Sequence, residues 1–455
     1  MRRYYSLCCV ALAISLVAIC SISAIAKENK PEELKKVTLE CDEGWQLKVT
    51  PFFSVGADVI NQSVHGKTKA RTKSLTIEYL PDALLLVGLE RVKGKPNEPN
   101  NEEFILPLLD SDSGKVLHLR LDGSCLYAND TCVCIGFRKN TDIPAWIKKH
   151  GDDIKKSDLR FVFVETTDKY LPLLQWLKES GVGVGIINAG EKQPPDKKKK
   201  VVPCSTAFAQ ALVAVQPKYF AAVSDQEIGK LNIPFGDLKN LVSLMVFSMN
   251  SNDIVAKPNV EKRSDPSVAI ASTKLRHLCL LGFVVPKKEL PKLANLKSFN
   301  ACLVPDNNMN LFDKIPQLQM LLVAPTGYHL TPSVLEKLPN LQYLAASFPP
   351  DTDFSFVGKM PYLQTLAITN MTEKHNLTPL AKYPQLKYLA LKGPDFKKMM
   401  EFETVKKFQK ERPDVEVVEA EGLCLGSFWI LPMVVLVGMG VWLVRRRRGV
   451  FHGPY

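Results

Sequence analysis

The stretch Lys337-Leu-Pro-Asn-Leu-Gln-Tyr-Leu-Ala-Ala decides the fold, because the same pattern returns from Lys359 and again from Lys382. The anchor leucine at the fifth position of this pattern recurs every 21 to 23 residues. Its positions are Leu275, Leu296, Leu318, Leu341, Leu363 and Leu386. A fixed period of this size is typical of a solenoid, whose repeats stack so that each contacts only its neighbours.

Each repeat contains signals for one strand and one short helix. Four copies have a proline two residues before the anchor leucine, at Pro316, Pro339, Pro361 and Pro384. A proline removes a backbone donor and ends a helix that runs into it, so continuous helices are incompatible with this spacing. After the anchor, Leu344 and Ala346 share one face of a strand; before it, Leu335 and Leu338 lie one helical step apart. The unit is therefore strand, turn, short helix and strand.

The pattern resembles the leucine-rich repeat family, specifically its irregular class with units of about 22 residues. The resemblance covers residues 238–392 and implies a protein-binding α/β solenoid. At one position the sequence departs from the family pattern. The asparagine usually found three positions after the last strand leucine is replaced by Thr326, Pro349, Met371 and Pro394. The hydrogen bonds that this asparagine would make in the turn must therefore be made by other groups.

The expected fold is an α/β leucine-rich-repeat solenoid, preceded by a small, mainly β domain and followed by one transmembrane helix. The mainly β domain is predicted from strand-like stretches, such as residues 75–80, that are separated by turn-rich linkers. The predicted boundaries are 1–26 for a signal peptide, 27–150 for the mainly β N-terminal domain, 155–235 for a solenoid-like α/β entry region, 236–420 for the leucine-rich-repeat solenoid with its C-terminal cap, 425–444 for the transmembrane helix and 445–455 for a basic cytoplasmic tail.

Both ends of the chain predict export and anchoring in a membrane. Two arginines, an apolar run over residues 8–22 and small residues at 24 and 26 follow the order of a secretory signal peptide. Residues 425–444 carry no charge, are long enough to cross a bilayer and precede four arginines at 445–448. By the positive-inside rule these arginines stay in the cytoplasm, so the bulk of the chain is expected outside it, in the cell envelope or at the cell surface. The alternative is a cleaved sorting signal, because Cys424 and the segments after it resemble those of bacterial exported proteins.

The net charge gives no reason to expect a nucleic-acid partner. The chain carries a formal charge of +12, and six of its basic residues are the arginines of the two tails. The remaining 53 basic and 47 acidic residues leave the exported body at +6, which is weak over this length. A membrane and a protein are therefore the expected partners.

Four cysteines of the N-terminal domain are candidates for disulfides, because an exported chain meets oxidising conditions. Cys125 and Cys132 close what reads as a hairpin turn, so their sulfurs should lie close together. We predict one disulfide between these two cysteines and a second between Cys41 and Cys134. A zinc site is the alternative, although this spacing is unusual for zinc and no histidine lies near.

The sequence contains no catalytic motif. Gly181-Val-Gly-Val-Gly lacks the third glycine of a nucleotide-binding loop and enters a strand, so it is read as a helix-to-strand turn. The histidines are scattered, which leaves open only a catalytic triad built from distant positions. We therefore predict a non-enzymatic recognition or scaffolding protein without cofactor or metal. The alternatives are a hydrolase of envelope polymers with its chemistry in residues 27–150, and a structural spacer.

The predicted binding site is the concave face of the solenoid. In each strand the core residues alternate with outward ones, which form two weakly polar rows. The residues predicted to bind a protein partner are His277, Asn300, Met320, Leu322, Tyr343, Thr365 and Tyr388. A stripe with so little charge is expected to be covered, and its tyrosines are good anchors for a partner. The alternative is that the N-terminal domain, or a second copy of the chain through self-association, packs there.

Overall fold

The computed structural model describes residues 30–50, 54–55, 74–92, 101–122, 125–137, 141–188, 204–224, 233–248, 274–281, 292–302, 312, 314–324, 330–393 and 395–419. The predicted signal peptide, transmembrane helix and basic tail (1–26, 425–444 and 445–455) lie outside these residues. Within the described residues, no helix combines the length and the apolar character that a bilayer crossing requires.

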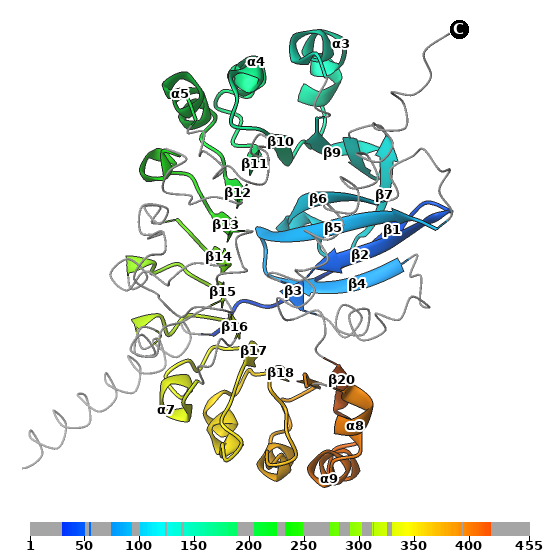
Figure 1. The fold of residues 1–455 in the computed structure, drawn as a ribbon, viewed down its shortest axis with the longest axis vertical. Coiled ribbons are helices and arrows are strands. Elements are labelled where there is room, and N and C mark those ends of the chain that lie inside the picture. The colour runs from blue at the N-terminus through cyan, green and yellow to red at the C-terminus, as the bar shows by residue number, and fades with distance from the viewer. Residues whose placement is uncertain are drawn as a thin grey trace, which may run out of the picture.

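A curved parallel sheet runs through most of the described chain (Figure 1). Its strands are β10 (Phe161–Val164), β11 (Gly183–Asn188), β12 (Tyr219–Ser224), β13 (Ser243–Ser248), β14 (His277–Leu281), β15 (Ser298–Cys302), β16 (Met320–Ala324), β17 (Tyr343–Ala346), β18 (Thr365–Ile368), β19 (Tyr388–Leu391) and β20 (Glu416–Glu419). Each strand pairs with the next in sequence order, and the register aligns Leu321, Leu344, Leu366 and Leu389 across neighbouring strands. The repeat of the sequence is therefore the repeat of the structure, and the predicted solenoid is confirmed.

Short helices cover the outer side of this sheet (Figure 1). They are α3 (Ile143–Lys155), η2 (Asp168–Tyr170), α4 (Leu171–Trp176), α5 (Thr206–Val215), η4 (Phe235–Asp237), α7 (Pro332–Leu335), η9 (Phe354–Lys359), η10 (Thr378–Lys382), α8 (Phe396–Met400) and α9 (Glu403–Glu411). The anchor leucines Leu341 and Leu363 are fully buried in the core that also contains Leu335 and Val357 of these helices. Because the anchors recur at one phase, this core continues from repeat to repeat.

In the turns after β17 and β18, other side chains take the place of the asparagine that the resemblance to leucine-rich repeats leads us to expect. The Asn370 side chain accepts a hydrogen bond from the backbone N–H of Phe348 at 2.9 Å and donates one to its carbonyl at 2.7 Å. The buried His375 ring lies 3.2 Å from the same carbonyl through Nε2. These contacts join the loop after β17 to the loop after β18. They provide hydrogen bonds in the turn that the expected asparagine would otherwise make.

The N-terminal domain is built mainly from strands. They are β1 (Lys35–Cys41), β2 (Trp45–Thr50), β3 (Ser54–Val55), β4 (Ser74–Tyr79), β5 (Ala83–Arg91), β6 (Asn101–Leu108), β7 (Val116–Asp122), β8 (Cys125–Ala128) and β9 (Thr131–Gly136), with the turn η1 (Asp110–Asp112) before β7. Strands β2, β5 and β6 form a separate antiparallel sheet. Strand β1 lies between β4 and β7, and β7 leads through β8 to β9.

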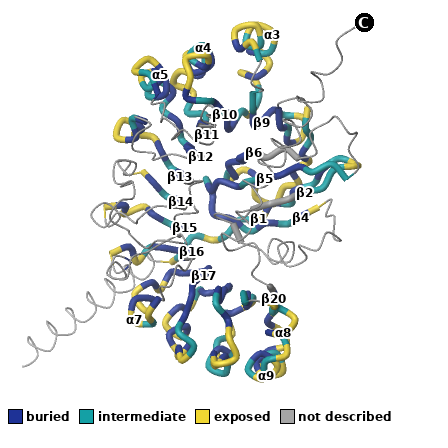
Figure 2. The backbone as a smooth tube through the Cα atoms, viewed as in Figure 1, coloured by how far each residue is buried: buried dark blue, intermediate teal, exposed yellow. Residues whose placement is uncertain are grey.

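Strand β9 joins the N-terminal domain to the solenoid within one sheet. Cys134 of β9 pairs with Leu126 of β8 in antiparallel fashion and with Phe161 of β10 in parallel fashion. From this junction the N-terminal domain lies in the hollow of the curved sheet, against its concave side (Figure 1). Figure 2 shows that the strands facing the domain are buried, whereas the outer helices carry the exposed residues. The concave face is thus an interior surface of the molecule.

Candidate functional site

The sheet register places the predicted binding residues side by side. One row consists of His277, Ser298, Met320, Tyr343, Thr365 and Tyr388, each paired with the next. The neighbouring row consists of Cys279, Asn300, Leu322, Ala345, Ala367 and Ala390. All the predicted residues therefore lie on the concave half of the solenoid, one or two to a strand.

The chain's own N-terminal domain covers these rows. The exposed fractions are 0% for His277, 1% for Thr365, 3% for Asn300, 4% for Met320, 5% for Tyr343 and 8% for Leu322, and Tyr388 has intermediate exposure. Met320, Leu322 and Tyr343 pack in one apolar core with residues of β1, β4 and β5. The sequence left open whether a partner, the N-terminal domain or a second copy of the chain covers this face. In the structure the N-terminal domain covers it. Contact between these residues and a partner stays a prediction, and it requires that this domain move away.

A polar cluster around Asp82 fastens the domain to the solenoid. Asp82 lies in the turn between β4 and β5, where its backbone adopts a φ of +70°. Its carboxylate accepts hydrogen bonds from Lys218 Nζ at 2.7 Å and from Tyr219 Oη at 2.8 Å, and Arg276 Nη1 lies 3.5 Å away. The Ser243 hydroxyl donates a hydrogen bond to the backbone carbonyl of Asp82. One turn of the domain thus contacts the amino-terminal ends of three successive solenoid strands, β12, β13 and β14.

The charge of Asp82 is stabilised by these contacts. Burial alone would raise the pKa of its carboxyl group, but the hydrogen bonds from Lys218 and Tyr219, together with the charges of Lys218 and Arg276, hold that pKa below its usual value. Asp82 is therefore ionised at neutral pH, and removing it would leave the two cations without their shared carboxylate.

His277 of the predicted row contacts the N-terminal domain through a hydrogen bond. Its Nε2 lies 2.9 Å from the carbonyl of Pro81, and its Nδ1 lies 2.8 Å from the Ser298 hydroxyl. Burial lowers the pKa of this ring to about 4, so the imidazole is neutral at pH 7. Because a carbonyl can only accept, Nε2 carries the proton and Nδ1 accepts from Ser298.

Two further ion pairs connect the domain and the solenoid. The Arg160 guanidinium, directly before β10, donates to both carboxylate oxygens of Asp112 at 2.6 and 2.9 Å, and both side chains are almost completely buried. Burial disfavours the charge of Arg160, yet its bonds to Asp112 raise the pKa of the guanidinium. Farther along the solenoid, the Glu32 carboxylate forms an ion pair with Arg276. The backbone carbonyl of Glu32 accepts a hydrogen bond from the Gln342 side chain, directly before β17, at 2.7 Å. These contacts extend the closed interface from β10 to β17.

The predicted disulfides are not formed among Cys41, Cys125, Cys132 and Cys134 in the part of the chain that the structure describes. Cys125 and Cys132 do lie near each other, since Cys132 pairs with Tyr127, which is two residues from Cys125 in β8. The strand order does not favour the predicted pairing of Cys41 with Cys134. Cys41 pairs with β7, and β8 separates β7 from β9, so the two cysteines lie three strand spacings apart, on the order of 14 Å. A disulfide requires Cα atoms within about 7 Å.

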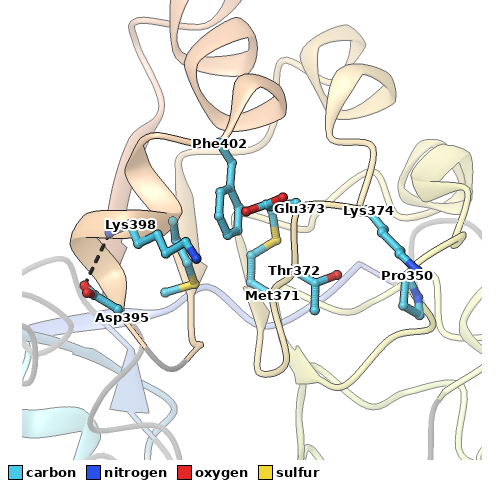
Figure 3. Close-up of a pocket in the computed structure, with 9 residues that line it drawn as sticks. Pro350, Met371, Thr372, Glu373, Lys374, Asp395, Lys398 and Phe402 are labelled. Carbon is cyan, nitrogen blue, oxygen red and sulfur yellow. Dashed lines mark hydrogen bonds between the residues drawn. The ribbon is translucent and has the colours of Figure 1, made fainter.

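An open groove of about 450 Å³ lies at the carboxyl ends of β17 to β19, outside the covered face (Figure 3). Its floor is apolar, with the buried Met371 and Met399 and the half-buried Phe402. Exposed lysines, Lys374 and Lys398, stand toward opposite ends in Figure 3. This groove is open to a partner while the N-terminal domain stays in place.

The described residues were expected to hold neither a metal nor a cofactor, and the structure can be compared with that expectation only for metal ligands. No group of three His, Cys, Asp or Glu side chains there is arranged to hold a metal ion. Sequence reasoning missed the residues that fasten the interface, above all Asp82, Lys218 and Arg160. The available signal was slight: Pro81-Asp82 is a turn sequence between two strand-like stretches, which predicts a turn but not what the turn contacts.

Comparisons with known proteins give only a distant likeness. No model of a known protein family matches the sequence, and no curated protein matches it. Similar solved structures include an internalin C2 from Listeria monocytogenes (18% identity, 44% of this chain and 80% of that chain, TM-score 0.25) and an internalin F from the same species (14% identity, 68% and 80%, TM-score 0.35). A leucine-rich repeat protein from Leptospira interrogans is 13% identical over 57% of this chain and 90% of that chain, with a TM-score of 0.20. Because these scores are low, the solenoid is defined by its own strand register and repeat length.

Proposed function

We propose that this protein is a non-enzymatic recognition or scaffolding protein, held by residues 425–444 in a membrane, whose solenoid binds a protein partner outside the cytoplasm. The observation that carries the proposal is the occupied concave face. This face already accommodates a folded protein surface, with an apolar centre and charged contacts at its edge. An interface of that composition is typical of protein recognition.

The N-terminal domain acts in this proposal as a built-in competitor for the concave face. A partner that uses Tyr343 and Thr365 has to bind a form in which the domain has moved away. Its apparent affinity is then reduced by the fraction of molecules in that open form. Weakening the closed form should therefore strengthen capture of the partner.

Asp82 offers the sharpest test of this competition. We expect Asp82→Ala to increase the amount of partner cross-linked to the full chain in its native cells, because three solenoid side chains lose their shared carboxylate. Asp152→Ala, on the exposed side of α3, is the matched control and should leave capture unchanged. In the Asp82→Ala background, where the closed form is already weakened, Tyr343→Ala combined with Tyr388→Ala should reduce capture, while Lys337→Ala combined with Lys382→Ala, on the outer side, should not.

Other outcomes would point to other surfaces or functions. If Asp82→Ala leaves capture unchanged and charge reversal of Lys374 and Lys398 abolishes it, the partner binds the open groove and the concave face serves the fold alone. If Asp82→Ala produces dimers by size-exclusion chromatography with light scattering, the vacated face takes the N-terminal domain of a second chain, which is self-association by domain swapping.

The hydrolase and spacer alternatives are tested on the full chain, because the N-terminal domain and the solenoid share a sheet through β9. Release of soluble fragments from envelope polymers by the purified chain would favour the hydrolase. A chain without any saturable partner would favour the spacer.

A further inference from the structure

The hairpin formed by β8 and β9 carries three cysteines whose side chains face two different cores. In β9, Cys132 pairs with Tyr127 and Cys134 pairs with Leu126, so Val133 is an extra residue without a partner of its own. Residues two apart in a regular strand share a face. Here the bulge at Val133 turns Cys132 away from Cys134, which is a common effect of a bulge.

The bulge brings Cys132 to the same side as Cys125. Cys125 and Tyr127 are two apart in β8 and therefore share a face, and Tyr127 stands opposite Cys132. The two cysteines accordingly belong to the core of the solenoid, whereas Cys134 belongs to the core of the N-terminal domain. Cys125 is therefore the diagonal neighbour of Cys132 across the hairpin, and the Cys132 thiol donates a hydrogen bond to the carbonyl of Cys134 at 3.9 Å. The bulge thus places Cys125 and Cys132 on one face of the hairpin and Cys134 on the other.

We propose that Cys125 and Cys132 form a redox-active pair that closes to a disulfide in the exported protein, with Cys134 excluded. The oxidant is a low-molecular-weight or protein disulfide. The thiolate of Cys125 attacks one sulfur of that disulfide and releases one thiol, which leaves a mixed disulfide. Cys132 then gives up its proton and attacks the sulfur of Cys125, which releases the second thiol. Two protein thiols are oxidised by two electrons, and one external disulfide is reduced to two thiols.

The environments of the thiols assign these roles. Cys125 is 8% exposed and Cys132 is 2% exposed, so Cys125 is the more accessible to an external disulfide. The hydrogen bond from Cys132 lowers the pKa of Cys125, and the same contact raises the pKa of Cys132. Complete burial raises the pKa of Cys134. Cys125 is therefore the attacking thiol and Cys132 the resolving one, while Cys134 is inert.

The position of the pair gives the disulfide a structural consequence. Strand β9 is bonded to β8 on one side and to β10 on the other. A bond between Cys125 and Cys132 fastens this strand at the junction of the N-terminal domain and the solenoid, and it restricts the unfolded chain as well. The disulfide itself does not depend on the proposed function; only its effect on partner capture does.

The sequence allows a direct test by mass spectrometry. The full-length chain is equilibrated in glutathione buffers from reducing to oxidising, free thiols are blocked with iodoacetamide, and the chain is cut on the amino side of aspartate. Cleavage before Asp130 separates Cys125 from Cys132. We expect the two fragments to stay joined in oxidising buffer and to separate after reduction. In reducing buffer, iodoacetamide should modify Cys125 at least several-fold faster than Cys132 or Cys134.

Matched variants identify the partner of Cys125. Cys134→Ser should keep the joined fragments, and Cys132→Ser should lose them. The proposal would be overturned if the two fragments were already separate before reduction even in the most oxidising buffer. It would also be overturned if the link persisted in Cys132→Ser and disappeared in Cys134→Ser. Partner capture measured in oxidising and reducing buffer is a separate readout: if the disulfide forms and capture does not change, the pair stands and its effect on the proposed function is excluded.

Discussion

His277 should make the closed molecule sensitive to acid. Burial lowers the pKa of its ring to about 4 and the charge of Arg276 acts in the same direction, while the Pro81 carbonyl and the Asp82 charge oppose them. In the unfolded chain the pKa of a histidine is about 6.5. Between these values the unfolded chain binds a proton that the folded chain lacks. Stability is therefore fully present above about pH 6.5 and is lost as the pH falls toward 4, by roughly 3 kcal/mol at most.

Thermal unfolding of the wild type and His277→Gln measures this effect. Glutamine retains a donor for the Pro81 carbonyl but cannot titrate, so the variant should lose less stability than the wild type between about pH 7 and pH 4.5. Carboxylates titrate in both proteins and cancel in the comparison. Equal losses in the two proteins would mean that His277 is not buried as a neutral ring.

The strands of the repeats should depend on their buried leucines. Leu366 is fully buried at the centre of β18 and aligned with Leu344 and Leu389 on the neighbouring strands. Leu366→Ala is expected to cost about 2–5 kcal/mol of unfolding free energy, because it leaves a cavity between repeats. Lys382→Ala, an exposed substitution in η10, should change stability by about 0.5 kcal/mol or less. A melting temperature that does not move in Leu366→Ala would mean that the register is wrong.

The elements that could be predicted are those with local signals. The recurring proline and anchor leucine predicted strand and helix in each repeat, and Gly181 marks a helix-to-strand turn, where it adopts a φ of +70°. The bulge at Val133 could not be predicted, because no residue type there requires it and its effect depends on the partner strand. For this reason sequence reasoning paired Cys125 with Cys132 across the hairpin and Cys134 with Cys41, without the bulge that turns Cys134 to the other face.

The closed arrangement of the whole molecule could not be derived from the sequence. Asp82 contacts Lys218 across 136 residues and Ser243 across 161, and no periodicity relates such positions. The indirect signal was the lack of charge along the predicted row, which indicated that the face is covered. That signal does not distinguish a partner from the N-terminal domain, because both bury the same residues.

The topology of the chain in the membrane is the last prediction. Arg445 to Arg448 follow an uncharged stretch of 20 residues, and moving such a cluster across a bilayer is strongly unfavourable. We therefore expect protease added outside the cytoplasm, to intact cells or to spheroplasts, to digest residues 27–420 and spare a short fragment that carries an epitope tag after Tyr455. Because a closed molecule can resist cleavage, the digestion is repeated with Asp82→Ala and in mild denaturant. Repeats that remain intact in both, and are cut once the membrane is permeabilised, would place the solenoid on the cytoplasmic side.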